Sequence, residues 1–224
     1  MAPRSLPQKL ERYQLATIPL PTLRLLEQLA EASWIRTWYL AGGTALALHY
    51  AHRSSEDLDF FTEQRSFRGQ LLAERLPSVA PWQATLQRKG TLYGRLGGVK
   101  ISFIAYPWFR PAHVERAGYL RILGPDDIAV MKMIAVAQRG RRRDFVDLYT
   151  YCRRGHALGT LLERVRRQYP DRTPDIAHLL RSHVFFDDAE KDPPVRLVEP
   201  VAWRTITAFF EREVSALGKK YFGL

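Results

Sequence analysis

Cysteine is nearly absent from this chain of 224 residues, because Cys152 is the only one. A single cysteine excludes an internal disulfide and a zinc site built from cysteines, and it favours a reducing, cytosolic compartment. Long hydrophobic runs are also missing: His, Arg or Asp interrupts every apolar stretch, whereas a membrane helix needs about 20 apolar residues. The first residues, MAPRSLPQKLERYQ, contain no apolar segment of a signal peptide. We therefore expect a soluble, cytoplasmic protein that does not enter a membrane.

Acidic residues are scarce relative to basic ones. The chain has 23 acidic and 34 basic residues, a net charge of +11, and 27 of the basic residues are arginine. Such an excess attracts polyanions, and the guanidinium group matches the geometry of phosphate. The charge indicates nucleic acid, nucleotides or an acidic protein as partners. The alternative is a coding bias toward arginine with no partner behind it.

Hydrophobic periodicity divides the chain into a helical N-terminal segment (1–35), an α/β part (36–122) and a helical part (123–224). In the α/β part it predicts strands at 37–42 and 57–61, three antiparallel strands within 83–106, and helices at 44–52 and 66–76. Ser66 is the expected N-cap of the last of these helices. In the helical part we expect helices at 124–140, 144–154, 158–169, 173–184 and 200–218, and a connecting loop at 187–194.

A glycine pair follows the first predicted strand, in the sequence AGGTALAL. The start of a helix leaves backbone N–H groups unpaired, and glycine lets a phosphate approach them closely. Gly42 and Gly43 would then cradle phosphate, with the Thr44 hydroxyl as a further donor. The alternative is an ordinary strand-to-helix turn in which Thr44 is the N-cap.

Two aspartates, Asp57 and Asp59, lie one residue apart in the strand DLDFF. Because side chains alternate along a strand, both carboxylates point the same way while Leu58 faces the core. Their mutual repulsion is relieved by a bound Mg²⁺, which prefers oxygen ligands and keeps positions open for substrate phosphates. The alternative is a surface strand with solvated aspartates. Together with the glycine turn, the pair predicts a site for a metal-bound nucleoside triphosphate.

The stretch GGTALALHYAHRSSEDLDFF (42–61) resembles the first motif of polymerase-β-like nucleotidyltransferases, and more narrowly that of the AbiEii-like toxins of type IV toxin–antitoxin systems. The resemblance continues in MKMIAVAQRGRRRDFVDLY (131–149) and in FFDDAEKDPPVRLVEPVAWRTITAFFEREV (185–214), so it covers the chain from about Thr37 onward. It implies an α+β fold in which a polymerase-β-like core with a mixed or antiparallel sheet precedes a C-terminal helical bundle.

The resemblance also implies the roles of several residues. Lys132, within an apolar helix, corresponds to the lysine that contacts the nucleotide phosphates. The alternative is that the Lys132 side chain extends along the protein surface and places its ammonium in solvent. Asp144 corresponds to an active-site aspartate that orients or deprotonates the attacking hydroxyl, whereas helix capping would explain it without chemistry. We expect Asp147 to pair with a nearby arginine and Arg53 to touch phosphate.

The turn RGRRRD precedes Asp144, and as a nucleic-acid contact it would supply Arg139, Arg141, Arg142 and Arg143. A solvated basic loop is the alternative. One position departs from the polymerase-β-like pattern: Ser102 stands where a third metal-binding carboxylate is expected, which questions a two-metal mechanism.

The predicted activity is the Mg²⁺- or Mn²⁺-dependent transfer of a nucleoside monophosphate from a nucleoside triphosphate to RNA, and the resemblance points to a tRNA 3′ end and a cognate antitoxin. The alternatives are transfer to a hydroxyl of a protein or small molecule, and a non-catalytic relative that binds RNA or protein.

Overall fold

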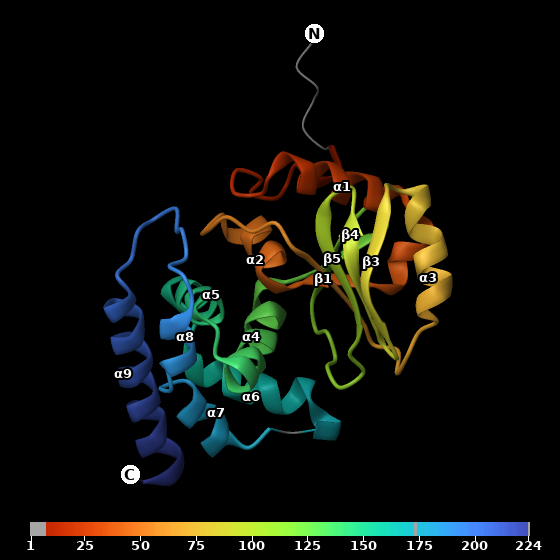
Figure 1. Cartoon of the computed structure of the whole chain (residues 1–224). Helices are drawn as coiled ribbons and strands as arrows, with labels where there is room; N and C mark the ends of the chain where they lie inside the picture. Colours follow the sequence, from red (N-terminus) through yellow and green to blue (C-terminus); the bar gives the residue numbers. More distant parts are fainter. Residues whose placement is uncertain (1–7, 173, 224) are drawn as a thin grey trace. The chain divides into compact units, whose positions relative to one another are not determined.

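The computed structural model describes residues 8–172 and 174–223. The chain divides into two compact units, residues 1–124 and residues 125–224 (Figure 1). No helix among the described residues is long and apolar enough to cross a membrane.

A seven-stranded mixed sheet forms the centre of the first unit, with the strand order β3-β4-β5-β2-β1-β7-β6. The strands are β1 (Tyr39–Ala41), β2 (Leu58–Thr62), β3 (Trp82–Arg88), β4 (Thr91–Leu96), β5 (Val99–Ala105), β6 (Val114–Ala117) and β7 (Leu120–Leu123). β3, β4 and β5 form an antiparallel meander, whereas β2 pairs with β5 and β1 pairs with β7 in parallel. The parallel pairing of β2 with β5 places Asp59 directly beside Ser102.

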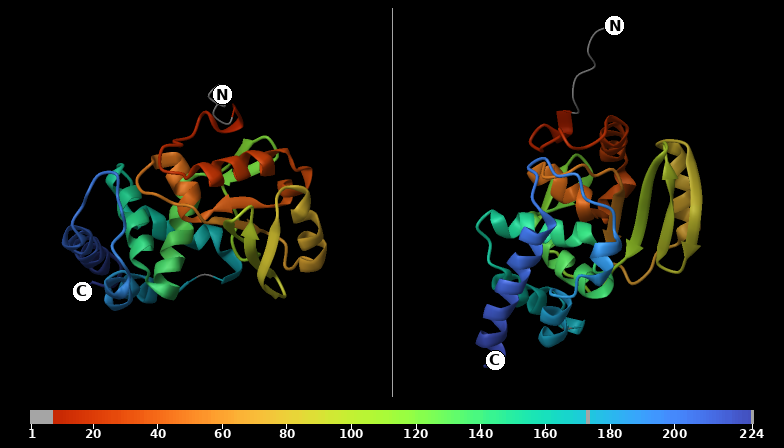
Figure 2. Two further views of the ribbon diagram at one scale, coloured as in Figure 1. Left: turned by 45° about the horizontal axis from the view of Figure 1, so that its top comes forward. Right: turned by 60° about the vertical axis from the view of Figure 1, so that its left-hand side comes forward.

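Three α-helices support this sheet: α1 (Leu20–Glu31), α2 (Gly42–Tyr50) and α3 (Gly69–Arg75). Short 3-10 turns lie at Gln8–Leu10, Ser33–Thr37 and Leu76–Ser78. α1 packs against β5 and β7, α2 packs against β1 and β2, and α3 runs beside β3 (Figures 1 and 2). Aromatic rings fill the core: Phe60 stacks on Phe103 at 5.4 Å, and Trp38 meets Phe103 edge-on at 5.0 Å.

The second unit is helical, and its longest apolar helix, α4, lies against three others, α5, α6 and α7. Its helices are α4 (Pro125–Arg139), α5 (Arg142–Arg153), α6 (Leu158–Gln168), α7 (Ile176–Ser182), α8 (Asp187–Lys191) and α9 (Trp203–Phe222), with a 3-10 turn at Pro170–Arg172. Phe145 of α5 lies at the aromatic centre of the unit, because its ring is 5.2 Å from Phe186 and 5.3 Å from Phe210.

Most predicted elements are present, and three local expectations were wrong. α3 begins at Gly69 after Arg68 and has no side-chain cap, so Ser66 is not its N-cap. The first five residues of the predicted loop at 187–194 form the short helix α8. The sequence analysis also missed β6 and β7, although β7 pairs with β1 near the centre of the sheet.

Candidate active site

The glycine pair forms a tight turn between β1 and α2, which begins at Gly42. Gly42 has φ +71°, a left-handed conformation that favours glycine, and a Cβ at this position would lie 2.9 Å from Oδ2 of Asp59. A Cβ on Gly43 would overlap the Nη2 atom of Arg53. The positive φ of Gly42 requires glycine there, whereas a side chain at position 43 would have to displace the end of the Arg53 side chain.

Thr44 does not have the role of an N-cap, since it lies inside α2 and the N-cap position belongs to Ala41. Its side chain is 1% exposed and donates a hydrogen bond of 2.5 Å to the carbonyl oxygen of Asp57. Its hydroxyl is also 2.9 Å from that of Ser55, a residue that the sequence analysis did not single out. Thr44 thus ties the glycine turn to the segment that carries Asp57.

Asp57 and Asp59 are arranged as the alternation of strand side chains predicts. Leu58 and Phe60 are completely buried, whereas both aspartates are partly exposed on the other side of the chain. Asp57 immediately precedes β2, and Asp59 is its second residue. The two carboxylates therefore belong to one side of the strand, and Asp59 adjoins the glycine turn.

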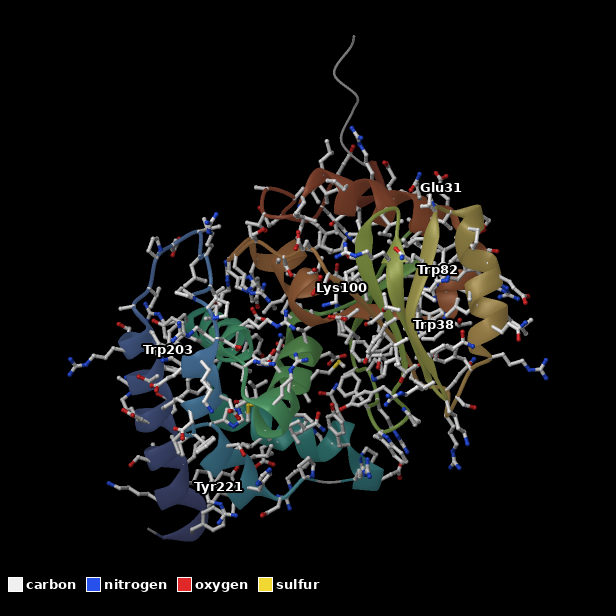
Figure 3. The ribbon with its side chains drawn as sticks, in the orientation of Figure 1. Glu31, Trp38, Trp82, Lys100, Trp203 and Tyr221 are labelled. Carbon is white, nitrogen blue, oxygen red and sulfur yellow. The ribbon has the colours of Figure 1, made fainter. Side chains whose placement is uncertain are left out.

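Each carboxylate has a partner from the neighbouring strand β5. Ser102 donates a hydrogen bond of 2.6 Å from Oγ to Oδ1 of Asp59. Lys100 places its ammonium 3.5 Å from Oδ2 of Asp57, and its position on the sheet is labelled in Figure 3. The serine at the expected third-carboxylate position therefore orients Asp59, and Lys100 is a cation that the sequence analysis did not assign to the site.

The donor set of this unit fits one divalent cation. Two carboxylates are enough for Mg²⁺ when substrate phosphates and water complete its oxygen ligands. Within residues 8–172 and 174–223, no three His, Cys, Asp or Glu side chains gather as a metal-binding group. Asp57 and Asp59 would hold the ion, and the described residues offer no third carboxylate for a second one.

The second unit contains a buried charge cluster formed by Lys132 of α4 and two aspartates of α5. Lys132 Nζ lies 2.7 Å from Asp144 Oδ1 and 2.6 Å from Asp147 Oδ2. Lys132 is 5% exposed and both aspartates are fully buried, so the lysine does not extend along the surface to solvent. Asp147 pairs with this lysine, and its expected pairing with an arginine stays a prediction. Lys132 thus meets an anion, as its apolar surroundings predict, but in this structure the anions are carboxylates of its own chain.

Arg139 adds a fourth charge at the edge of the buried charge cluster, with 49% of its side chain exposed. Its Nε and Nη2 donate to the two carboxylate oxygens of Asp144 at 2.9 and 3.1 Å. Burial alone would raise the pKa of Asp144, but the Lys132 ammonium and the Arg139 guanidinium outweigh it and hold the pKa below its usual value. Asp144 lies in the first turn of α5, whose N-cap is Arg141, so it is not the cap of that helix.

The basic turn, residues 139–143, is partly engaged inside the second unit. Arg141 forms an ion pair of 2.6 Å with Asp192, whose other oxygen accepts the backbone N–H of Arg142. The Arg142 guanidinium lies 4.7 Å from the ring centroid of Trp203, which is labelled in Figure 3. Arg143 is exposed. The turn predicted to contact nucleic acid is therefore held in place by Asp192 and Trp203.

These elements define a class of enzyme, the nucleotidyltransferases. The sequence pattern of the family described as "Nucleotidyl transferase AbiEii toxin, Type IV TA system" matches residues 24–115 and 115–220. The chain therefore belongs to the AbiEii nucleotidyltransferase toxin family, and both the predicted family and the predicted enzyme class are confirmed.

The chain is also similar to one sequence relative and, in fold, to solved structures. An uncharacterised protein of Aquifex aeolicus is 35% identical over 193 residues, which span 84% of this chain and 92% of that protein. The nucleotidyltransferase toxin MenT4 of Mycobacterium tuberculosis has a TM-score of 0.52 at 15% identity, with 89% of this chain and 85% of that chain covered. The protein JHP933 of Helicobacter pylori has a TM-score of 0.50 at 17% identity, over 96% and 94% of the two chains. The predicted fold, an α+β nucleotidyltransferase core followed by C-terminal helices, is confirmed.

Proposed function

We propose that this nucleotidyltransferase transfers a nucleoside monophosphate from a nucleoside triphosphate to the 3′ end of an RNA, with tRNA as the first acceptor to test. The acceptor hydroxyl oxygen forms a bond to the α-phosphorus, the bond from that phosphorus to the bridging oxygen breaks, and pyrophosphate leaves while the hydroxyl proton passes to solvent. Such a transfer depends mostly on positioning and on neutralising charge. The observation that carries the proposal is the close approach of the Asp59 carboxylate to Gly42, beside the paired Asp57.

Asp57 and Asp59 are the residues that would hold Mg²⁺ or Mn²⁺. When bound, the ion supplies positive charge against the triphosphate oxygens. Ser102 of β5 donates a hydrogen bond to one oxygen of Asp59, which lies on the paired strand β2. The pairing of the two strands and this hydrogen bond together fix the orientation of the carboxylate. Asp59 is therefore oriented before any substrate binds, and little reorganisation is needed.

The glycine turn is proposed to receive the triphosphate tail. Gly42 and Gly43 open the N-terminus of α2, where unpaired backbone N–H groups favour an anion. Arg53 is 6% exposed and its guanidinium lies over Gly43, so it would add a fixed positive charge to this place. Thr44 would act through its hydrogen bond to the carbonyl of Asp57 rather than by touching phosphate, since its hydroxyl is already engaged.

On the helical unit, Lys132 is proposed to neutralise charge on the phosphates, and Asp144 is proposed to orient the attacking hydroxyl. The low pKa of Asp144 makes this carboxylate a weak base, so of the two expected roles, orientation suits it better than proton removal. Asp144 holds both Lys132 and Arg139, while Asp147 holds Lys132 from a second side.

RNA is proposed as the acceptor because of the basic surface. The net charge is +11, and the basic turn (Arg139, Arg141, Arg142 and Arg143) concentrates part of it. Membership of a toxin family further supports a cognate antitoxin as partner, and both substrates are available in the cytoplasm, where we place the reaction.

The test is a labelling reaction with purified protein, total RNA, Mg²⁺ or Mn²⁺, and each of the four α-labelled nucleoside triphosphates in turn. We expect label on an RNA species with one nucleotide, and a loss of about 100-fold or more in Asp59→Asn, because the amide cannot supply the carboxylate charge. Asn at this position still accepts the Ser102 hydrogen bond, so the fold around it is kept.

Glu56→Gln is the matched control, because Glu56 is an exposed carboxylate three residues before Asp59 and its removal should leave labelling within about twofold. Lys132→Met would be assayed after thermal melting has established its folded fraction. Label that appears equally with Asp59→Asn, or no label on any RNA with either metal, would contradict the proposal. Label on a protein or a small hydroxyl compound would keep the enzyme class and replace the acceptor.

A further inference from the structure

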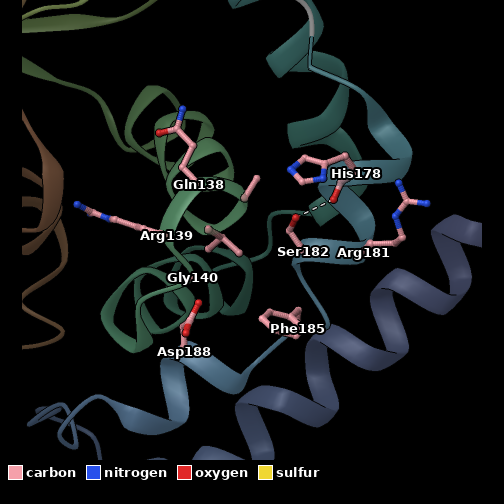
Figure 4. A pocket seen from close by; sticks show the side chains of 10 residues that line it. Gln138, Arg139, Gly140, His178, Arg181, Ser182, Phe185 and Asp188 are labelled. Carbon is pink, nitrogen blue, oxygen red and sulfur yellow. Dashed lines mark hydrogen bonds between the residues drawn. The ribbon is translucent and has the colours of Figure 1, made fainter.

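A pocket of about 380 Å³ lies in the helical unit, among the C-terminal end of α4, α7 and α8 (Figure 4). Its walls are formed by residues of three stretches, Val136–Gly140, His178–Phe185 and Asp188. Apart from Arg139, none of these residues has a part in the proposed chemistry. The pocket is large enough for a flat ring system of the size of a nucleobase.

One wall of the pocket carries an unusually exposed aromatic ring. Phe185 is 56% exposed, and Figure 4 shows its ring on the same side of the pocket as Ser182, opposite the end of α4. Val136 and Ala137 supply further apolar surface from α4. A flat aromatic ligand that stacks on Phe185 would cover apolar surface that is otherwise exposed to water.

One exposed cation, Arg181, lines the same pocket as this ring, together with the carboxylate of Asp188. Arg181 is exposed on α7, and among the described residues no carboxylate lies within ion-pair distance of its guanidinium. The acidic residue of the pocket, Asp188, is paired with Lys191 at 3.2 Å. The basic turn continues directly from the pocket wall at Gly140. An exposed aromatic ring together with an arginine is an arrangement by which proteins bind unstacked bases and their phosphates.

We propose that this pocket binds an unpaired base of the acceptor RNA, with the base stacked on Phe185 and an adjacent phosphate held by Arg181. The inference rests on the proposed function for the identity of the RNA as acceptor. A base-paired duplex is excluded as the ligand, because its bases are stacked on each other and cannot enter a pocket. The pocket therefore selects single-stranded ends or loops.

Arg139 connects this pocket to the buried charge cluster. Its stem lines the pocket, and Figure 4 shows its side chain extending away from Phe185, while its guanidinium donates two hydrogen bonds to Asp144. Arg139 therefore belongs both to the lining of the pocket and to the contacts of Asp144. The same arginine that shapes the pocket holds an aspartate proposed for the active site.

The experiment measures binding directly, by fluorescence anisotropy of a labelled ten-nucleotide single-stranded RNA ending in CCA. Phe185→Ala should weaken binding by roughly tenfold, which is the usual effect of losing one stacked base. Phe185→Tyr keeps an aromatic face and should bind within about twofold of the parent. Phe222→Ala is the matched control, since Phe222 is 48% exposed at the end of α9 and outside the pocket.

Arg181→Gln should weaken binding several-fold and reduce the slope of log affinity against log salt by about 0.7, the value for one phosphate on a single strand. Lys219→Gln, an exposed cation of α9, serves as its control. Binding of the same RNA annealed to its complement should not respond to Phe185→Ala. Equal affinities of the parent protein and Phe185→Ala would overturn the inference, as would equal losses for the single strand and the duplex.

Failure of this inference and failure of the proposed function can be told apart. If Phe185→Ala still transfers label to RNA, with the KM for RNA and the RNA affinity of the parent, the proposed function holds and the proposed base pocket is contradicted. If RNA binding depends on Phe185 but the parent protein transfers no label to RNA, the base pocket is supported and the proposed transfer to RNA is contradicted. A Phe185→Ala variant that binds RNA normally but loses a protein partner would assign the pocket to that partner and also overturn the inference.

Discussion

At the scale of single residues, Gly42 combines two constraints that can be separated by experiment. Its φ of +71° disfavours any L side chain, and a Cβ would also meet Oδ2 of Asp59 at 2.9 Å. Gly98 has a φ of +81° but nothing within 4 Å of its would-be Cβ. A side chain at either position would therefore strain the backbone, but only a side chain at position 42 would also contact the Asp59 carboxylate.

Alanine at either position should lower the free energy of unfolding by about 1 kcal/mol through the positive φ. Gly42→Ala should in addition displace Asp59 and reduce nucleotide transfer by roughly tenfold or more, whereas Gly98→Ala should retain activity. Chemical denaturation and the labelling assay measure the two effects on the same preparations. Full activity of Gly42→Ala would show that the position of Asp59 does not depend on the missing side chain.

At the scale of elements, the packing of α4 on α5 depends on a charge cluster in which Lys132, Asp144 and Asp147 are almost completely buried and Arg139 is half-exposed. Lys132 and Arg139 offset Asp144 and Asp147 within the buried charge cluster. Removing one member of such a group leaves an uncompensated charge in a medium that solvates it poorly. The stability of the helix pair should therefore be far more sensitive to Lys132 than to a lysine on the surface.

Lys132→Met is expected to lower the free energy of unfolding by about 3 kcal/mol or more. Lys191→Met is the control, because Lys191 pairs with Asp188 on the surface with 74% of its side chain exposed, and its loss should cost at most about 0.5 kcal/mol. The double variant Lys132→Met/Asp147→Leu should recover part of the loss, since it removes a charge of each sign. Urea unfolding of the three variants tests this, and equal effects of the two lysines would contradict it.

The elements also show where reasoning from sequence succeeds. The alternation around Asp57 and Asp59 and the apolar periodicity of α4 are local patterns, and each was readable from adjacent residues. β6 and β7 are only four residues long and carry charged side chains, whose partners come from distant segments: Glu115 accepts from Tyr13, and Arg121 pairs with Glu63. The anionic partners of Lys132 could likewise not be predicted from the sequence, because they depend on how α4 packs against α5.

At the scale of the whole molecule, the charge of +11 is spread over both units. Residues 1–124 contain 16 basic and 9 acidic residues, and residues 125–224 contain 18 basic and 14 acidic residues. Binding of RNA to such a surface releases counterions, so affinity must fall as salt is added.

Raising KCl from 50 to 200 mM should weaken RNA binding by roughly one to two orders of magnitude, as expected for a few phosphate contacts on a single strand. Anisotropy titrations at four salt concentrations give the slope. Affinity for the nucleoside triphosphate, measured in parallel, should change much less, because a mononucleotide lacks the condensed counterions of a polymer. A flat salt dependence for RNA would mean that the basic excess does not contact the acceptor.

The stacking of Arg142 on Trp203 gives the helical unit an optical reporter of its own. The chain has five tryptophans, and Trp203 is the one within residues 125–224. With the other four replaced by phenylalanine, the emission would come from an indole whose ring centroid lies 4.7 Å from a guanidinium of the basic turn. A phosphate that draws Arg142 away from the indole would change the intensity and wavelength of that emission, so stopped-flow fluorescence could time the arrival of RNA separately from the chemistry.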